Sequence, residues 1–506
     1  MCEPTRKGIS PENVAHPKAV PEGVITAVAI SLLVLVSTTL SLRVTAPQLS
    51  WDEADYALAA QQKWRILPYT SVHSQGPLIL YLIKLSPEAP RWLMSREDQP
   101  RLLLALMGSM AVGVTYWGLR HVFATSRLGA VAGAYLLMLS VIRLRETNIL
   151  GPHYPLLIWT LLVCVLGYLL RNTPTISAAL VLGTVFGVAA STTDYVIVLA
   201  TCWGAAIVVT RAKWLEYDRF HLRSPWTTLL LLTTAVIVVS VIWPPSIRHL
   251  ELLDNFRDHL SNAGKDHFTL VDHEFLKRPP ITTHFYWLWH LDAPIFCFGL
   301  LGLIHSLYQT YERRSVTIEQ RWLLPYLGVL CAAALASQNG GPRNFLAAIA
   351  GICLFAGATC DEFIRGHKWR TVVFACLLMT WPIGNLVLVE MRADEIPYLF
   401  WNGYRSFVEQ NQSRLGQPVV ASIDGVPMLR YYAGQSAIPV KWTMSELPWR
   451  LSEPIPRDAK YALISEVNYR YLPLEHPARS IIDRNWKVVW SFKEAGTWGL
   501  RLYERP

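Results

Sequence analysis

Two adjacent carboxylates, Asp52 and Glu53, stand in the stretch SWDEADYALA, shortly after the first apolar segment of the chain. A carboxylate held beside an acceptor hydroxyl can take its proton while a new bond forms, which helps a group that is a poor nucleophile at neutral pH. The same pair can instead hold a divalent cation such as Mg or Mn, and the residues alone do not separate the two roles. If such a pair lies just outside a membrane, a lipid-borne substrate and a water-borne substrate can meet beside it.

The same residues can also be explained entirely by the start of a surface helix. Ser50 followed three residues later by Glu53 forms a helix capping box, and Asp52 lies in the first turn, where the helix dipole favours negative charge. We therefore expect a helix from here through about Trp64, with Asp55 on the face of Asp52.

Polar residues also gather in LRETNILGPHYPLLIW, at the junction of the third and fourth apolar segments. Prolines interrupt the start of the fourth segment, and a broken helix start at membrane depth usually lines a cavity rather than facing lipid. The candidate substrate-binding residues in this stretch are Arg143, Arg145, Glu146 and His153. The alternative for Glu146 is a salt bridge to a neighbouring arginine.

Two further candidates are His73 and Arg343. His73 lies in HSQGPLILYL, which turns the chain back toward lipid, either as an ordinary interfacial histidine or as a member of the site. Arg343 lies in QNGGPRNFLAA, where an arginine needs an anion or must snorkel to the interface; a phosphate matches its planar fork. No histidine pair in the loop 245–289 shows the i, i+4 zinc pattern with a glutamate, so we predict no metal-ligating cluster there.

A membrane protein is expected to position these residues, because the 506-residue chain is 52% hydrophobic and only 16% charged. That mixture indicates a polytopic α-helical membrane part joined to a sizeable water-soluble part. About eleven apolar segments are long enough to be transmembrane helices. They span residues 24–42, 101–119, 128–142, 150–170, 175–190, 195–210, 226–244, 290–309, 322–337, 344–362 and 371–390. The first is too long for a signal-peptide core and is predicted to be a retained anchor.

Lys and Arg cluster in one set of the short connections between these segments, and the positive-inside rule places that set in the cytoplasm. The tail 1–23 is then cytoplasmic, and the loops 43–100 and 245–289 of the transmembrane domain 24–392 face outward. The net charge of +9 does not indicate a nucleic-acid partner, because the basic residues follow membrane topology.

Residues 393–506 are predicted to form a soluble, extracytoplasmic α/β domain. PVVASI, YALISE, WKVVWSF and TWGLRLYE are β-rich runs, and SFVEQNQSRLG and the stretch 428–432 favour helices. The cysteines lie near the N-terminus or in apolar segments, so no disulfide framework is available to this domain.

The chain resembles the GT-C superfamily of membrane glycosyltransferases, in particular the protein O-mannosyltransferases and the bacterial aminoarabinose (lipid A) transferases. The likeness rests on the carboxylate pair after the first span, the His-x-x-x-Pro-Leu return segment, the arginine-initiated second span RLLLALMG and Arg343. It implies a sugar donor carried on polyprenyl phosphate and an inverting transfer on the outer face of a cell membrane, expected to be the bacterial inner membrane. The acceptor would be a protein, a glycolipid or a polysaccharide.

The resemblance makes Asp52 the catalytic aspartate, Glu53 its neighbour, and Arg343 the arginine that meets the donor phosphate. Two positions depart from the family. Gly151 stands where many relatives carry a second acid before a proline, so Glu146 replaces that acid or the arrangement differs. The residue after Arg343 is asparagine, where tyrosine is common. These departures leave metal use and substrate identity open.

Two other classes of function stay open at this point. A transporter or lipid flippase would bind its substrate with charges inside the bundle, but most segments hold no midplane charge, and the sequence has no repeated half. A non-catalytic assembly or sensor protein would depend on its outer domain rather than on Asp52.

Overall fold

The computed structural model describes residues 21–43, 49, 51–61, 76–86, 97–146, 151, 153–212, 225–263, 268–271, 274–277, 281–311, 317–336, 342–364, 368–391, 403–414, 419–422, 425–434, 443–444, 459–465, 485–493 and 499–506. Among the candidate site residues, His73 lies outside these ranges. Asp52 is described as part of a helix backbone only.

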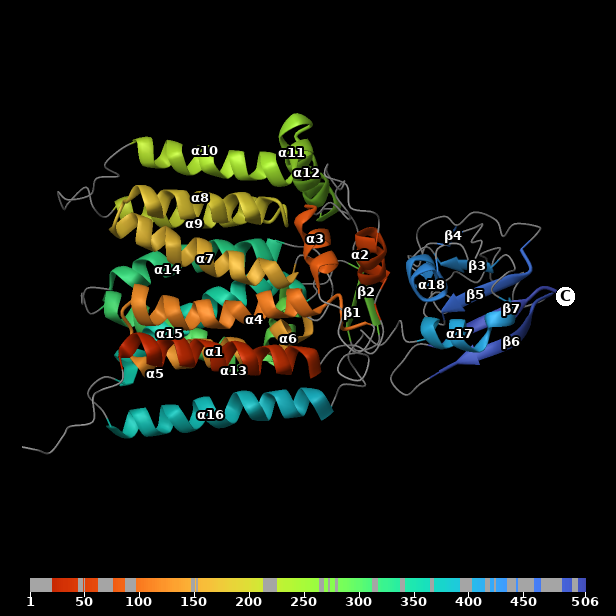
Figure 1. Ribbon diagram of the computed structural model, residues 1–506. Coiled ribbons are helices and arrows are strands. Elements are labelled where there is room, and N and C mark those ends of the chain that lie inside the picture. Colours follow the sequence, from red (N-terminus) through yellow and green to blue (C-terminus); the bar gives the residue numbers. More distant parts are fainter. Residues whose placement is uncertain are drawn as a thin grey trace, which may run out of the picture.

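Each predicted apolar segment coincides with a helix of one bundle, in which the helices run side by side (Figure 1). The helices are α1 (Glu22–Arg43), α4 (Leu102–Trp117), α5 (Arg127–Leu139), α7 (His153–Asn172), α8 (Ile176–Ala190), α9 (Val196–Ala212), α10 (Pro225–Ile242), α13 (Ile281–Tyr311), α14 (Ile318–Ala336), α15 (Leu346–Ile364) and α16 (Lys368–Met391). Six of them are long and apolar enough to cross a membrane, namely α1, α4 with its π-helical continuation, α7, α13, α15 and α16. The helical membrane fold is confirmed, and the predicted number of spans stays a prediction.

Small residues let the central helices approach closely. α15 has 83% of its apolar window buried, whereas α1, at 6%, and α16, at 22%, lie at the edge of the bundle. α5 and α15 touch through glycines, since a Cβ atom on Gly133 would lie 2.7 Å from the carbonyl oxygen of Cys353. Such close contact is the usual way to join helices in lipid, where the hydrophobic effect between them is weak.

One end of the bundle carries the folded parts of both long predicted loops (Figure 1). They are α2 (Trp51–Gln61), α3 (Leu78–Leu85), α11 (Pro244–Arg248), α12 (Glu251–Ala263) and the antiparallel hairpin of β1 (Phe268–Val271) and β2 (Glu274–Lys277). α13 begins at Ile281, inside the predicted loop 245–289, rather than near residue 290. It kinks at Asp292, whose φ and ψ are −135° and 41°, shortly before Pro294. Thr283 and His284, which belong to the predicted loop, are buried residues of this kinked helix.

The C-terminal part folds into a mixed sheet with two helices, at the same end of the bundle as α2 (Figure 1). The strand order is β4-β3-β5-β7-β6, with β3 parallel to β4 and β5, and β7 antiparallel to β5 and β6. The elements, together called the C-terminal sheet below, are α17 (Tyr404–Gln410), β3 (Val419–Ser422), α18 (Gly425–Ala433), β4 (Thr443–Met444), β5 (Tyr461–Ser465), β6 (Lys487–Phe492) and β7 (Leu500–Glu504). The predicted strands and helices of this region coincide with them, and the predicted boundary at residue 393 lies outside the described residues.

α2 packs between the bundle and the C-terminal sheet. Its buried Tyr56 and Ala57 share a hydrophobic cluster with Leu104 of α4, Phe407 of α17 and Met428 of α18. Burying large apolar side chains is the main favourable term in such an interface. The first helix after α1 is therefore held from two sides, which matters because α2 carries the carboxylate pair.

Candidate active site

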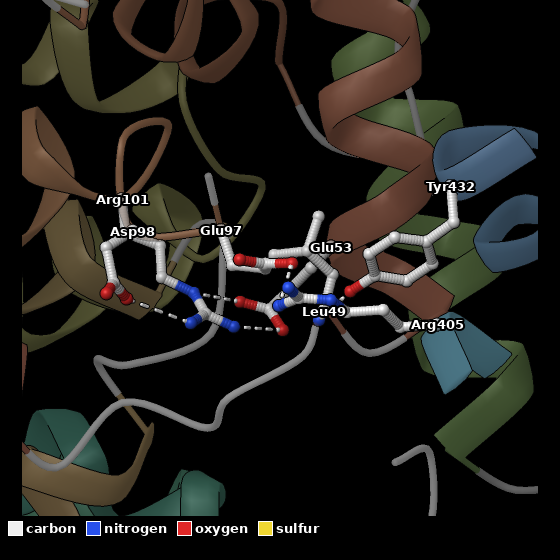
Figure 2. Close-up of polar contacts among 7 residues, drawn as sticks. All are labelled: Leu49, Glu53, Glu97, Asp98, Arg101, Arg405 and Tyr432. Atoms are coloured by element: carbon white, nitrogen blue, oxygen red, sulfur yellow. Dashed lines mark hydrogen bonds and ion pairs between the residues drawn. The ribbon is translucent and has the colours of Figure 1, made fainter. Parts of the chain in front are cut away.

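Glu53 of α2 is buried and makes a forked ion pair with Arg101, the residue before α4 (Figure 2). Arg101 Nε donates to Glu53 Oε1 at 2.8 Å, and Arg101 Nη2 donates to Glu53 Oε2 at 2.9 Å. Arg101 Nη1 also donates to Asp98 Oδ1 at 3.3 Å. Two parallel hydrogen bonds are the strong form of an arginine–carboxylate contact. Glu53 therefore fastens α2 to the start of α4, and both of its carboxylate oxygens take part.

Asp52 occupies a different side of α2 from Glu53. Successive helix residues are turned by about 100°, whereas residues one turn apart share a face. Asp52 stands one turn before Tyr56, and a Cβ atom at Gly151 would lie 3.7 Å from Tyr56 Cε2. Tyr56 of α2 therefore lies next to Gly151, just ahead of α7. Asp55, also on α2, is partly exposed.

Arg143 of α6 (Val141–Glu146) is fully buried and bound by neutral groups. Its Nη1 donates to Ser37 Oγ at 2.7 Å, and its Nη2 donates to Ser41 Oγ at 3.3 Å and to the Met138 carbonyl oxygen at 3.1 Å. Both serines belong to α1. Arg143 therefore ties the first helix to the junction of α5 and α6.

Asp292, for which the sequence predicted no function, holds the start of α6. Its carboxylate accepts hydrogen bonds from the Val141 backbone N–H at 2.8 Å, the Ile142 backbone N–H at 3.0 Å and Ser140 Oγ at 2.7 Å. A carboxylate at a helix N-terminus meets unpaired N–H groups and the positive end of the helix dipole. A lone acid two residues before a proline, inside an apolar segment, is the sequence signal that points to such a cap.

Arg145 and Glu146 follow at the end of α6, and both are buried. Arg145 Nε lies 3.7 Å from Glu146 Oε1, which is the neighbour salt bridge expected as the alternative for Glu146. The Arg145 guanidinium also lies 5.7 Å from the ring centroid of Trp287 on α13. α6 thereby places one positive and one negative group near the first half of α13.

Arg343 lies in the short 3-10 helix η2 (Pro342–Phe345), which contacts α6, α13, α14 and α15. Its side chain is exposed. His153, which stands two residues ahead of the candidate span of α7, is close enough to respond to it. Burial lowers the pKa of His153, and the positive charge of Arg343 lowers it further. The histidine is therefore neutral at physiological pH, and the positive charge here belongs to Arg343.

Neighbouring residues and one electrostatic effect relate α2 to this arginine. Tyr56 meets Gly151; a Cβ atom at Gly151 would also lie 3.8 Å from His153 Cδ2, and His153 in turn responds to the charge of Arg343. The structure thus brings Tyr56 of α2 close to the start of α7, where His153 lies. α6, with Arg145 and Glu146, contacts η2 beside them, while Arg143 is enclosed between α1 and α6.

Three charged residues of this region had no assigned role in the sequence. Arg101 begins the second span, Glu97 is buried four residues before it, and Arg405 of α17 pairs with Glu97. The run REDQPR, at the boundary of an apolar segment, carries a signal for Arg101, because acids so close to a membrane-flanking arginine favour a local ion pair. Nothing in the local sequence points to Arg405, which is distant in the chain.

Within the described ranges there is no group of three or more His, Cys, Asp or Glu side chains that could hold a metal ion. Glu53 fits a cation poorly, because both of its oxygens accept hydrogen bonds from the positively charged Arg101. A cation at the carboxylate pair would therefore depend on Asp52 rather than on Glu53.

The chain matches no protein-family model and no curated protein sequence. Among solved structures, the archaeal oligosaccharyltransferase AglB from Archaeoglobus fulgidus, in complex with an inhibitory peptide and a dolichol-phosphate, matches at 13% identity with a TM-score of 0.55 over 96% of this chain and 74% of that one. ArnT from Cupriavidus metallidurans bound to undecaprenyl phosphate matches at 14% identity with a TM-score of 0.56 over 96% of this chain and 98% of that one. The Archaeoglobus fulgidus oligosaccharyltransferase with zinc and sulfate matches at 15% identity with a TM-score of 0.51, over 94% and 73%.

These neighbours belong to the GT-C superfamily, and the match to ArnT extends over nearly the whole of both chains. The fold of this protein is therefore that of the GT-C membrane glycosyltransferases, as the sequence resemblance predicted. With its long apolar helices, the chain is a multi-pass membrane protein.

Proposed function

We propose that this protein is an integral membrane glycosyltransferase, which moves a sugar from a polyprenyl-phosphate donor to an acceptor hydroxyl. The observation that carries the proposal is the placement of Tyr56 and His153 on either side of Gly151, with the charge of Arg343 reaching His153, set in a GT-C fold. It joins the helix of the carboxylate pair to an exposed guanidinium. The dolichol-phosphate in AglB and the undecaprenyl phosphate in ArnT support a lipid phosphate as the carrier of the donor sugar.

Asp52 is the general base of the proposed reaction. Glu53 is already neutralised by Arg101, so it has little to offer an acceptor hydroxyl. Asp52, one residue earlier, is turned by about 100° around α2 from Glu53 and so stands on another side of the helix. A positioned base typically contributes about a hundred- to ten-thousand-fold to a rate. The two neighbouring acids therefore have different roles. Glu53 fixes α2 to the start of α4, and Asp52 takes the proton of the acceptor hydroxyl.

Arg343 is the group that binds the donor phosphate. An exposed guanidinium presents a fork of donors that matches phosphate oxygens. His153 is neutral beside it and offers a hydrogen bond without a second charge. Arg145 is a second cation near the site. The remaining predicted contacts to substrate are Asp55, His73, Arg143 and Glu146, of which Arg143 is enclosed by its serine partners.

The proposed step is one displacement. The acceptor oxygen bonds to the anomeric carbon as the bond from that carbon to the phosphate oxygen breaks, and the hydroxyl proton passes to Asp52. The lipid phosphate leaves with both bonding electrons, and the negative charge that develops on it is stabilised by Arg343. Because attack and departure occur on opposite sides of the carbon, the transfer inverts its configuration.

A divalent cation at Asp52 is the alternative use of that carboxylate, and the zinc-bound oligosaccharyltransferase structure favours testing it. The cation would supply positive charge to the departing phosphate. Full transfer by metal-free protein in a chelator would assign Asp52 to proton transfer, whereas loss and recovery on adding Mg or Mn would assign it to the cation.

The proposed orientation places the tail 1–23 in the cytoplasm and α2, η2 and the region 393–506 outside, in a bacterial inner membrane. α2 and the C-terminal sheet lie at one end of the bundle (Figure 1). The acceptor is a protein, a glycolipid or a polysaccharide of the cell envelope. A lipid flippase or transporter of the same fold would move its substrate without forming a covalent product, and product analysis separates the two.

The decisive experiment compares Asp52→Asn with Glu53→Gln in purified protein supplied with defined polyprenyl-phosphate sugars and an acceptor extract. Product is followed by mass spectrometry, and folding by gel filtration and thermal unfolding. We expect Asp52→Asn to keep the wild-type unfolding midpoint and lose about a hundred- to ten-thousand-fold in transfer. Glu53→Gln is expected to lower the unfolding midpoint, because it weakens a buried ion pair. Undiminished transfer by Asp52→Asn would remove Asp52 from the mechanism.

A further inference from the structure

Two polar contacts connect the C-terminal sheet to the chain on either side of α2 (Figure 2). The Tyr432 hydroxyl on α18 accepts a hydrogen bond from the Leu49 backbone N–H at 3.0 Å, two residues before α2 begins. Arg405 Nη1 on α17 donates to Glu97 Oε1 at 3.2 Å, in the turn that leads into α4. The sheet thus contacts both the segment that enters α2 and the turn to which α2 is fastened.

Glu97 depends on Arg405 for its charge balance. Its side chain is 2% exposed, whereas that of Arg405 is 44% exposed. The second oxygen of Glu97 accepts no hydrogen bond from the described part of the chain. A buried carboxylate whose counter-charge is removed must take up a proton or reach water. Either outcome disturbs the turn 97–101.

That turn is the support of α2. It contains Arg101, whose guanidinium holds Glu53 by two hydrogen bonds, and Asp98, which holds the same guanidinium at 3.3 Å. Asp52 is adjacent to Glu53 in the helix. A displacement of the turn is therefore transmitted to Asp52 through one ion pair. Misplacing a reacting group by about 1 Å can cost about a hundredfold in rate.

We infer that Arg405 of the C-terminal sheet is a positioning residue for the active site, acting through Glu97 and Arg101 to hold α2. The sheet is then part of the catalytic apparatus without supplying a group that touches substrate. The kinetic part of this inference rests on the proposed function of Asp52, whereas its structural part, the fixing of α2, does not.

The test is a double-mutant cycle of Arg405→Gln and Glu97→Gln in the full-length protein in lipid nanodiscs. Hydrogen exchange of the α2 amides, residues 51–61, reports local opening independently of any activity. Transfer kinetics give kcat and KM for the lipid donor. Arg405→Lys is the conservative variant, because it keeps a charge that reaches Glu97. Glu409→Gln is the matched control, because Glu409 also pairs with Arg405, at 2.8 Å from its Nε, through a side chain that is 59% exposed.

We expect Arg405→Gln to speed exchange in α2 by at least tenfold and to lower kcat by about a hundredfold with little change in KM, since the donor contacts of Arg343 are intact. On the Glu97→Gln background the same substitution should have little further effect. Arg405→Lys should recover most of the loss, and Glu409→Gln should behave as the wild type.

Unchanged exchange in α2 with Arg405→Gln would overturn the inference, whatever the activity. Equal effects of Arg405→Gln with and without Glu97 would overturn the route through that residue. Faster exchange in α2 with wild-type kcat would uphold the structural part and instead count against Asp52 as the base, so the two failures are distinguishable.

Discussion

Arg101 and Arg143 are both fully buried near the same end of the bundle, yet they are held by different partners. Arg101 meets the two oxygens of Glu53, a charged partner on the separate helix α2. Arg143 meets two serine hydroxyls and a carbonyl, and its charge is balanced at a distance by Asp292, whose carboxylate caps α6. The first arginine connects two elements through an ion pair, and that connection needs both charges. The second arginine is buried among neutral polar groups within the bundle.

Arg343 completes the comparison, because its side chain is exposed and lies beside His153. A buried arginine that is satisfied inside the protein contributes to stability and position. An exposed one in η2 is available for an anion. The difference teaches that the function of an arginine in this fold depends on its partners. The residue type alone does not reveal that function, because it is the same at all three positions.

The largest loss of stability is expected for Arg101→Ala. It leaves Glu53 buried without its counter-charge, and breaking such a pair from one side typically costs about 3–5 kcal/mol. The free energy of unfolding in mixed detergent micelles measures the loss. Arg101→Lys, which keeps the charge and loses the fork, should fall between this variant and the wild type. Wild-type stability of Arg101→Ala would mean that the ion pair between Arg101 and Glu53 does not stabilise the fold.

A smaller loss is expected for Arg143→Met. Ser37 and Ser41 can turn their hydroxyls back to carbonyls of their own helix, which limits the loss to the remaining unpaired groups and the charge of Asp292. We expect about 1–3 kcal/mol by the same unfolding measurement. If the charges of Arg143 and Asp292 balance each other, adding Asp292→Asn to Arg143→Met should recover part of the lost free energy of unfolding. A loss larger than that of Arg101→Ala would reverse the comparison.

The smallest effect on stability, within about 0.5 kcal/mol, is expected for the exposed Arg343→Ala. Its effect on transfer should instead be large, roughly a hundred- to a thousandfold, because it removes a donor aimed at developing phosphate charge. Arg430→Ala, which removes an exposed arginine of α18, is the control and should change neither quantity. Normal transfer by Arg343→Ala would assign the phosphate to another cation, with Arg145 the nearest candidate.

The apolar segments predicted the helices of the bundle well, since twenty or so apolar residues have few alternatives to a helix in lipid. The boundaries of α1 and α16 follow the predicted 24–42 and 371–390 within a few residues. The start of α13 was wrong by about nine residues. The helix carries Thr283 and His284 on buried positions, and a polarity pattern alone assigns such residues to a loop.

The sequence also indicated candidates for the site. The carboxylate pair, the polar start of α7 and Arg343 were singled out from their places at the ends of apolar segments. The ion pair of Glu53 with Arg101 could not be predicted, because the two residues are 48 positions apart in the chain. The contributions of Arg405 and Asp292 were also invisible, since their partners lie 308 and 150–152 residues away in the chain.

The sequence by itself determined that this protein crosses a membrane and places acidic chemistry beside an apolar segment, because hydrophobic length and charge are local properties of the chain. Tertiary structure alone decided which charged side chains pair with one another and which stay available to bind a ligand. That outcome depends on distance and burial between segments far apart in the chain, and the energy of an ion is set by what surrounds it rather than by its neighbours in sequence.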